Sequence, residues 1–82
     1  MYQSKNINSE LIDSKGVRKG VVAVTVYFEA DGPLFIEHKG KNYLFTGKRG
    51  TDSDTGEAVR ELANDNGARL WITLDGQMIW QD

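Results

Sequence analysis

The stretch "TDSDTGEAVRELANDNG", residues 51–67, decides the fold class that the sequence predicts, because it is where a helical pattern interrupts strand-like segments. Asp54 can cap a helix with Glu57 three residues later, and Asn66-Gly67 offers a left-handed stop. The apolar side is a narrow stripe at helical spacing, made of Ala58, Val59, Leu62 and Ala63. The stretch therefore predicts one helix from about Thr55 to Asp65, packed through one side only.

The segment after this stretch, "RLWITLDGQMIWQ" (residues 69–81), predicts a β-hairpin. Asp75-Gly76 lies between two alternating runs, and this residue pair is preferred in two-residue type I′ turns. The resulting register sets Trp71 opposite Trp80 and Ile72 opposite Ile79. The other side of this hairpin is aliphatic and consists of Leu70, Ile72, Leu74 and Ile79.

The segments before the stretch predict three more strands. "LFIEHKGKNYLFT" (residues 34–46) forms a hairpin if Lys39-Gly40 is its loop, with His38 facing Lys41 and Ile36 facing Tyr43. "GVVAVTVYFEADGP" (residues 20–33) has the β-branched and aromatic content of a strand that ends at a Gly-Pro turn. Alternation gives that strand a core face of Val22, Val24, Val26 and Phe28.

The order strand, hairpin, helix, hairpin predicts an α+β domain, with an antiparallel sheet of about five strands and one helix packed on one face. We expect this single domain to span residues 17–82, at a length near the lower limit for a fold held by its core alone. Residues 1–16 are mostly polar and are expected to form an N-terminal arm, whose local structure the pattern leaves open.

One helix cannot cover both faces of a sheet. If it covers the aliphatic side, the opposite face is rich in aromatic residues and carries Tyr27, Phe35, Leu44, Trp71, Met78 and Trp80. Aromatic residues and Met among polar ones are typical of contact surfaces. The main hypothesis is therefore a protein-binding face, for another protein or for a second copy in a homodimer. The alternative is that the N-terminal segment covers these aromatics, or that the sheet curls so that both faces are partly internal.

The same face offers a second hypothesis, the binding of single-stranded nucleic acid. Bases stack on sheet aromatics while cations follow the backbone, and the candidate cations form a basic lip of Lys39, Lys41, Lys48 and Arg49. The net charge of −2 weighs against a mainly electrostatic grip on nucleic acid or on an anionic membrane. Charge is also uneven, at +3 over residues 1–50 and −5 over residues 51–82.

No catalytic or metal-binding constellation is visible. The chain has no cysteine and one histidine, which is too few nitrogen and sulfur ligands for a usual zinc site. His38 lacks an orienting acid, because the neighbouring Glu37 points to the opposite face of its strand, and "TGKRGTDSDTGE" matches neither a phosphate loop nor a twelve-residue calcium loop. We therefore expect no enzymatic activity and no cofactor. No apolar run is long enough for a signal peptide or a membrane span, so we expect a soluble, cytoplasmic protein.

The layout of "EAVRELANDNGARLWITLDGQMIWQD" (residues 57–82) is similar to that of small prokaryotic and phage domains, and the similarity extends to roughly residues 34–82. Some phage-encoded inhibitors of bacterial defence systems look like this, so the resemblance implies a binding protein and identifies no site. "IEHKGKNYLF" (residues 36–45) is similar in part to small hemin-uptake proteins. The residues after Tyr43 depart from that pattern, so we expect no haem.

Overall fold

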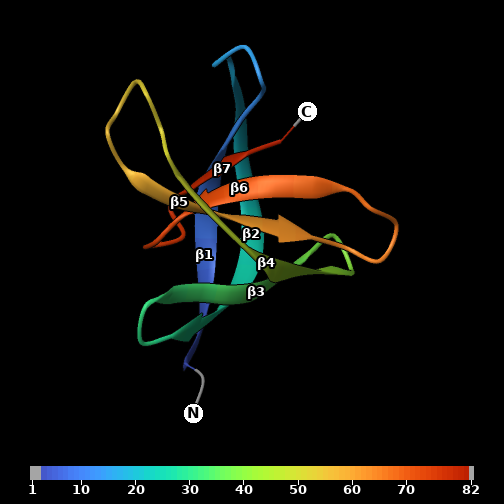
Figure 1. Cartoon of the computed structure of the whole chain (residues 1–82). Helices are drawn as coiled ribbons and strands as arrows, with labels where there is room; N and C mark the ends of the chain where they lie inside the picture. Colours follow the sequence, from blue (N-terminus) through green and yellow to red (C-terminus); the bar gives the residue numbers. More distant parts are fainter. Residues whose placement is uncertain (1–2, 82) are drawn as a thin grey trace.

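The computed structural model describes residues 3–81, which form an all-β barrel. Seven strands follow one another around it, namely β1 (Gln3–Ile12), β2 (Arg18–Glu29), β3 (Gly32–His38), β4 (Lys41–Thr51), β5 (Ala58–Ala63), β6 (Arg69–Thr73) and β7 (Met78–Trp80). Successive strands pair antiparallel, and β1 closes the barrel by pairing parallel to β7 (Figure 1). The predicted α+β class with about five strands is therefore wrong.

The predicted helix from about Thr55 to Asp65 is wrong. Residues 3–81 contain no helix, and the middle of the predicted span is strand β5. β5 pairs with β4 on one side and with β6 on the other. A helix here would leave the facing edges of β4 and β6 unpaired, and this tertiary requirement overrides the helix-favouring composition of "AVRELA". The expected cap at Asp54 is also replaced, because Asp52 Oδ2 accepts hydrogen bonds from the Thr55 amide and hydroxyl at 2.9 Å each.

Most of the expected N-terminal arm is strand β1. It pairs with β2 along its whole length, and its inward residues Ile7 and Leu11 pack against the core. Near its end, Leu11 also pairs with Ile79 of β7, which brings the two ends of the sheet together. The sheet thus curls on itself, as in the alternative that the sequence left open.

The predicted register of the β3–β4 hairpin is confirmed. Ile36 pairs with Tyr43 and His38 pairs with Lys41. The loop residues Lys39 and Gly40 both have positive φ, at 53° and 75°, as a two-residue type I′ turn requires. Lys39 is the only non-glycine residue with positive φ among residues 3–81, so the register constrains this turn strongly.

The predicted register of the β6–β7 hairpin is also confirmed, with Trp71 opposite Trp80 and Ile72 opposite Ile79. Its turn is not the predicted type I′, because only Gly76 has positive φ, at 79°. Instead, the Gly76 amide donates to the Thr73 carbonyl at 3.0 Å, and the Thr73 hydroxyl donates to Asp75 Oδ1 at 2.7 Å. Side-chain bonding by Asp75 therefore selects a wider turn within the same register.

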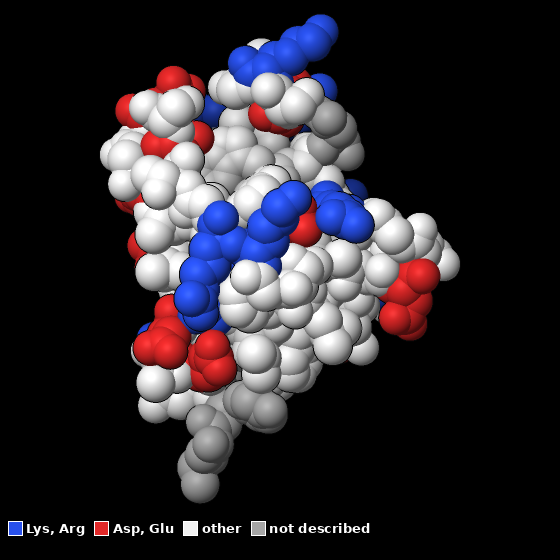
Figure 2. Space-filling view, viewed as in Figure 1, with Lys and Arg blue, Asp and Glu red and all other residues white. Residues whose placement is uncertain are grey.

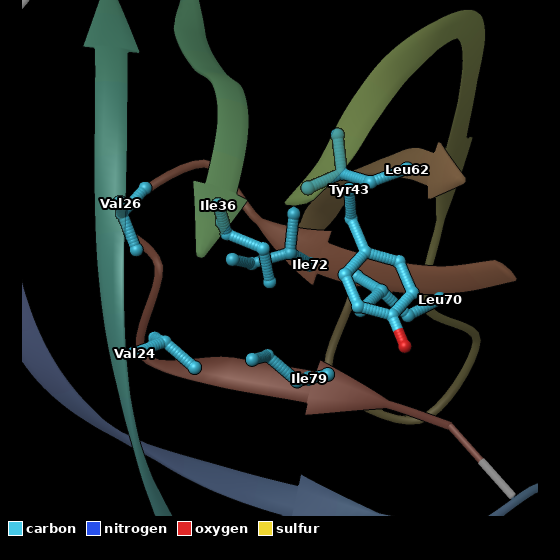
Figure 3. Close-up of a cluster of buried hydrophobic side chains, with 8 residues drawn as sticks. All are labelled: Val24, Val26, Ile36, Tyr43, Leu62, Leu70, Ile72 and Ile79. Atoms are coloured by element: carbon cyan, nitrogen blue, oxygen red, sulfur yellow. The ribbon is translucent and has the colours of Figure 1, made fainter. Parts of the chain in front are cut away.

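The barrel interior contains the aliphatic face of each strand, so the strands cover one another without a helix. Figure 3 shows the buried cluster of Val24, Val26, Ile36, Tyr43, Leu62, Leu70, Ile72 and Ile79. Around it, the partly buried Val22, Phe28 and Phe45 complete the packing. Burial of this cluster supplies the main favourable term in folding.

A buried arginine lies beside this core. The Arg60 side chain is 2% exposed, and its Nη1 donates to the Pro33 carbonyl at 3.1 Å and to Glu29 Oε1 at 2.9 Å. Its Cζ lies 4.4 Å from the centroid of the Phe45 ring. Arg60 thus ties β5 to the β2–β3 hairpin.

We expect Arg60→Ala to lower the free energy of unfolding by about 3 kcal/mol, because it breaks a largely buried ion pair and leaves the Pro33 carbonyl without its partner. Urea unfolding measures the change. Arg49→Ala is the matched control, since Arg49 is exposed, pairs with Arg60 across β4 and β5, and lies 5.7 Å from the same Phe45 ring. It should cost less than about 1 kcal/mol. Equal losses in the two variants would contradict this role of Arg60.

Candidate functional site

Three of the six residues of the expected binding face form a row on the outside of the barrel. Tyr27 pairs with Phe35 across β2 and β3, and Phe35 pairs with Leu44 across β3 and β4. The Tyr27 and Phe35 rings are stacked, with centroids 4.2 Å apart and planes 14° apart, and Leu44 is 53% exposed. We call Tyr27, Phe35 and Leu44 the aromatic row.

The other three residues lie on β6 and β7. Trp71 and Trp80 are directly opposite each other, and Met78 is on the same side of β7 as Trp80 because side chains alternate along a strand. All three are partly exposed, whereas Ile72 and Ile79 beside them are fully buried in the core. The structure therefore divides the expected face into two groups.

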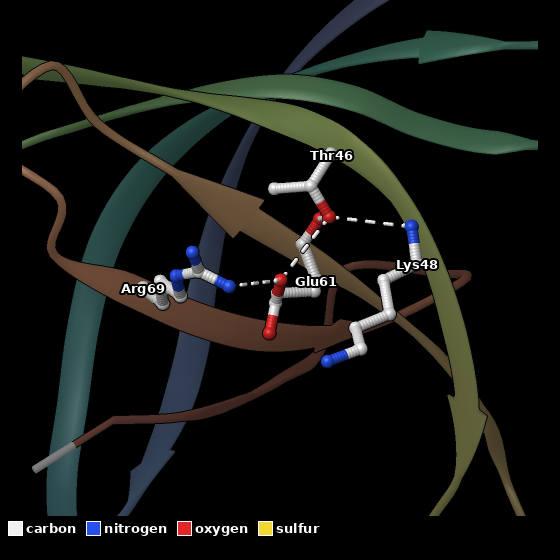
Figure 4. A network of polar contacts seen from close by, with 4 residues as sticks. All are labelled: Thr46, Lys48, Glu61 and Arg69. Carbon is white, nitrogen blue, oxygen red and sulfur yellow. Dashed lines mark hydrogen bonds and ion pairs between the residues drawn. The ribbon is translucent and has the colours of Figure 1, made fainter.

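A polar network lies between the two groups (Figure 4). Glu61 pairs with Trp71 across β5 and β6, and its Oε1 accepts hydrogen bonds from Thr46 Oγ1 and Arg69 Nη1 at 3.2 Å each. Thr46 Oγ1 also accepts from the Lys48 amide at 3.2 Å. Glu61 is only 5% exposed, so this outer side of β5 is covered by polar contacts and does not extend the apolar surface from one group to the other.

The two indoles line a hollow of about 440 Å³ on the outside of the barrel. The other described lining residues come from two loops and from strands β4 and β5, and they are Ser14, Gly50, Thr51, Asp52, Ser53 and Val59. Figure 2 shows this recess between the acidic loop at the upper left and the loop at the top of the view. We call it the tryptophan hollow, and its volume lies within the ~300–1,000 Å³ range of ligand sites.

Gly50 permits the position of one indole. A Cβ atom at Gly50 would lie 3.2 Å from Cζ3 of Trp71, which is closer than about nine in ten real Cβ contacts. The missing side chain on β4 therefore lets the ring of Trp71 lie against the backbone of the long strand. Gly50 thus contributes to the shape of the hollow through its small size, which strand alternation alone does not reveal.

Both loops beside the hollow are fixed by side-chain to backbone hydrogen bonds. In residues 13–17, Asp13 Oδ1 accepts from the amides of Lys15 and Val17 at 2.9 Å each. In residues 52–57, Asp52 binds Thr55, and the Asp52 amide donates to the Glu57 carbonyl at 2.8 Å. Such local bonds hold the loops in defined turns, so the walls of the hollow are largely formed before any ligand binds.

The four cations of the expected basic lip are placed in two pairs. Lys39 and Lys41 lie at the β3–β4 turn, whereas Lys48 and Arg49 lie in the second half of β4. Lys48 comes seven positions after Lys41, a rise of at most roughly 23 Å, because the strand is irregular between Phe45 and Arg49. All four are exposed, but they do not form one continuous strip.

His38 is the last residue of β3, and its side chain is buried. It is 5% exposed, its ring centroid is 6.1 Å from that of Tyr43, and its Nδ1 has no hydrogen-bond partner among the described residues. Burial lowers the pKa of His38 from its ordinary value of 6.5, and the nearby charge of Lys39 lowers it further. Within residues 3–81 no group of three or more His, Asp or Glu side chains is placed to hold a metal ion.

Comparisons with protein-family models, with curated proteins and with solved structures gave no match to this chain. Its class is therefore defined by its own fold and site, as a small all-β barrel with an aromatic hollow on its outer surface. Among residues 3–81 no helix could cross a lipid bilayer.

The lowered pKa of His38 predicts a pH-dependent stability. The unfolded chain takes up a proton at about pH 6.5, whereas the folded chain does so only at lower pH. The free energy of unfolding should therefore fall as the pH drops below about 6.5, by at most about 1.4 kcal/mol per pH unit from this group, and stop falling below the folded-state pKa. His38→Leu should remove this part of the pH dependence, measured by urea unfolding at pH 7.5 and 5.5. Identical pH dependence in the two proteins would contradict the assignment.

Proposed function

We propose that this protein is a small non-enzymatic binding module that recognises another protein through the tryptophan hollow. The observation that carries the proposal is the position of Trp71 and Trp80, two partly exposed indoles side by side in a preformed recess. Trp is enriched among the residues that dominate binding energy, and a recess around such a residue excludes water from the contact. The hollow thus has the composition and the shape of a contact site.

The two indoles are not part of the hydrophobic core of the barrel. The core is closed by aliphatic residues and Tyr43, and both tryptophans point away from it. A chain of 82 residues has little apolar surface to spare, so two large rings on the outside need a reason other than core packing. Contact with a partner supplies that reason.

The walls of the hollow favour binding with little rearrangement. Asp13 and Asp52 already bond the backbone of their own loops, so a partner need not order these segments. A preformed site avoids much of the conformational entropy cost that weakens association.

The nucleic-acid hypothesis has less support from the geometry. The Tyr27 and Phe35 rings stack on each other, which occupies one face of each ring, and the four exposed cations are divided between the β3–β4 turn and the second half of β4. Together with the net charge of −2, this arrangement gives no continuous track for a phosphate backbone. A cytoplasmic location and a role as a phage or bacterial inhibitor stay predictions.

A display experiment tests the proposed function. Random peptides are selected on the whole wild-type chain, and the affinities of the enriched peptides are then measured for Trp71→Ala, Trp80→Ala and Leu44→Ala. Each tryptophan variant should bind at least ~10-fold more weakly, because truncation of a central aromatic typically costs about 2 kcal/mol or more. Leu44→Ala, which alters the aromatic row, should bind within about twofold of the wild type.

Three controls make the result decisive. Urea unfolding shows whether each variant is folded at the assay temperature, light scattering shows whether a second copy is the partner, and gel shifts with single-stranded and duplex oligonucleotides at low salt test nucleic acid. The proposal fails if no peptide is enriched, if the enriched peptides bind folded tryptophan variants as well as the wild type, or if only oligonucleotides bind.

A further inference from the structure

We propose that the tryptophan hollow takes the cationic side chain of a Lys or Arg from the partner protein, an inference that rests on the proposed function and specifies its ligand chemistry. Three features of the hollow agree on this: its charge, its two indoles, and the arrangement of one carboxylate on its wall.

The charge around the hollow is negative. Of the described residues that line it, one is an acid, Asp52, and none is Lys or Arg. The adjoining loop of residues 52–57 adds Asp54 and Glu57 and contains no cation. The loop of residues 13–17 contributes Asp13 against one cation, Lys15. A basic side chain complements this surface, and an acidic one is repelled.

Four cations near the hollow contact groups outside it, whereas Lys15 and Lys48 are exposed and form no ion pair within residues 3–81. Arg18 Nη1 is 2.7 Å from Glu10 Oε1, and Lys19 Nζ is 3.8 Å from Asp13 Oδ2. Arg69, on β6, forms an ion pair with Glu61, and Arg49, on β4, lies 5.7 Å from the centroid of the Phe45 ring. None of these four contacts engages Asp52, so its charge stays available to a ligand.

Indole rings are the best partners for a cation among the aromatic side chains. A Lys ammonium or Arg guanidinium over the face of Trp gains about 0.5–1 kcal/mol at exposed sites and about 2 kcal/mol when water is excluded. The aliphatic stem of either residue can pack on Val59 and on the rings, with the charged head at the polar rim. Trp71 and Trp80 together thus suit a long side chain that is apolar along its length and cationic at its end.

The Asp52 carboxylate is held by hydrogen bonds to only one of its two oxygens. Its Oδ2 accepts both hydrogen bonds from Thr55, and within the described part of the chain Oδ1 accepts none. The turn also fixes its backbone, since the Gly56 amide donates to the Asp52 carbonyl at 2.8 Å. Asp52, which lines the hollow, therefore has one carboxylate oxygen without a hydrogen-bond partner within residues 3–81, and this oxygen can accept a charge-assisted hydrogen bond.

The test is a titration of the whole chain with three defined probes, N-acetyl-lysine methylamide, N-acetyl-arginine methylamide and the uncharged N-acetyl-norleucine methylamide. The readout is the NMR signal of the two indole N–H groups. The two cationic probes should shift these signals saturably, and norleucine should bind at least ~10-fold more weakly, because it lacks the charge-dependent terms.

Asp52→Asn should weaken the cationic probes about 3- to 10-fold and leave norleucine unchanged, while it keeps an oxygen that can accept the Thr55 bonds. Asp65→Asn is the matched control, because it makes the same change of charge on the exposed β5–β6 loop, outside the hollow. It should change cation affinity less than twofold.

The inference is overturned if norleucine binds as tightly as the cationic probes, if none of the three probes shifts the indole signals, or if Asp65→Asn weakens cation binding as much as Asp52→Asn. These results leave the proposed function standing, since peptide selection on the tryptophan variants decides that point separately. Selected peptides that depend on both tryptophans but contain no essential Lys or Arg would likewise reject the cation and retain the binding module.

Discussion

Closure of the sheet is the constraint on which the rest of this structure depends. An open sheet of this length exposes two edges of unpaired amide and carbonyl groups, and here β5 joins β4 to β6 while the end of β1 pairs with β7. Once the sheet is closed, the interior is narrow and takes the aliphatic side chains of each strand. Alternation along β6 and β7 directs Ile72 and Ile79 into this core and places Trp71 and Trp80 on the outside, where they line the hollow.

The sequence predicted what is local in this fold. Both hairpin registers are confirmed because turn residues and alternating patterns act over a few positions, as at Lys39-Gly40 and at Trp71 opposite Trp80. It did not predict β5, because Ala58–Ala63 has helix-favouring residues and is held as a strand by partners on both sides. Arg60 and Glu61 lie on opposite faces of this strand and both are buried although charged, which the pattern of apolar residues does not predict.

One overlooked signal connects two distant loops. Asp13 and Asn64 each stand three residues before a glycine of positive φ, and each side-chain oxygen accepts amide bonds from the residues two and four positions later. The shared spacing indicates the same hairpin loop at residues 13–17 and 64–68. This spacing predicts that Asn66-Gly67 lies in a hairpin loop and not at the end of a helix. It also predicts that the N-terminal segment and Ala58–Ala63, which precede the two loops, are strands.

The position of the hollow also explains why its residues could not be grouped from the sequence. Ser14, Gly50, Asp52 and the two tryptophans are separated along the chain and meet only because the long strands β1, β2 and β4 carry their loops past the barrel to the same end. The excess of acids in residues 51–82 is partly located there, in the loop that begins at Asp52. Asp52 forms the turn with one oxygen and also lines the recess beside the indoles, so the same residue contributes to local folding and to the charge of the site. The chemistry of the partner is therefore constrained by the same residue that shapes the wall of the site.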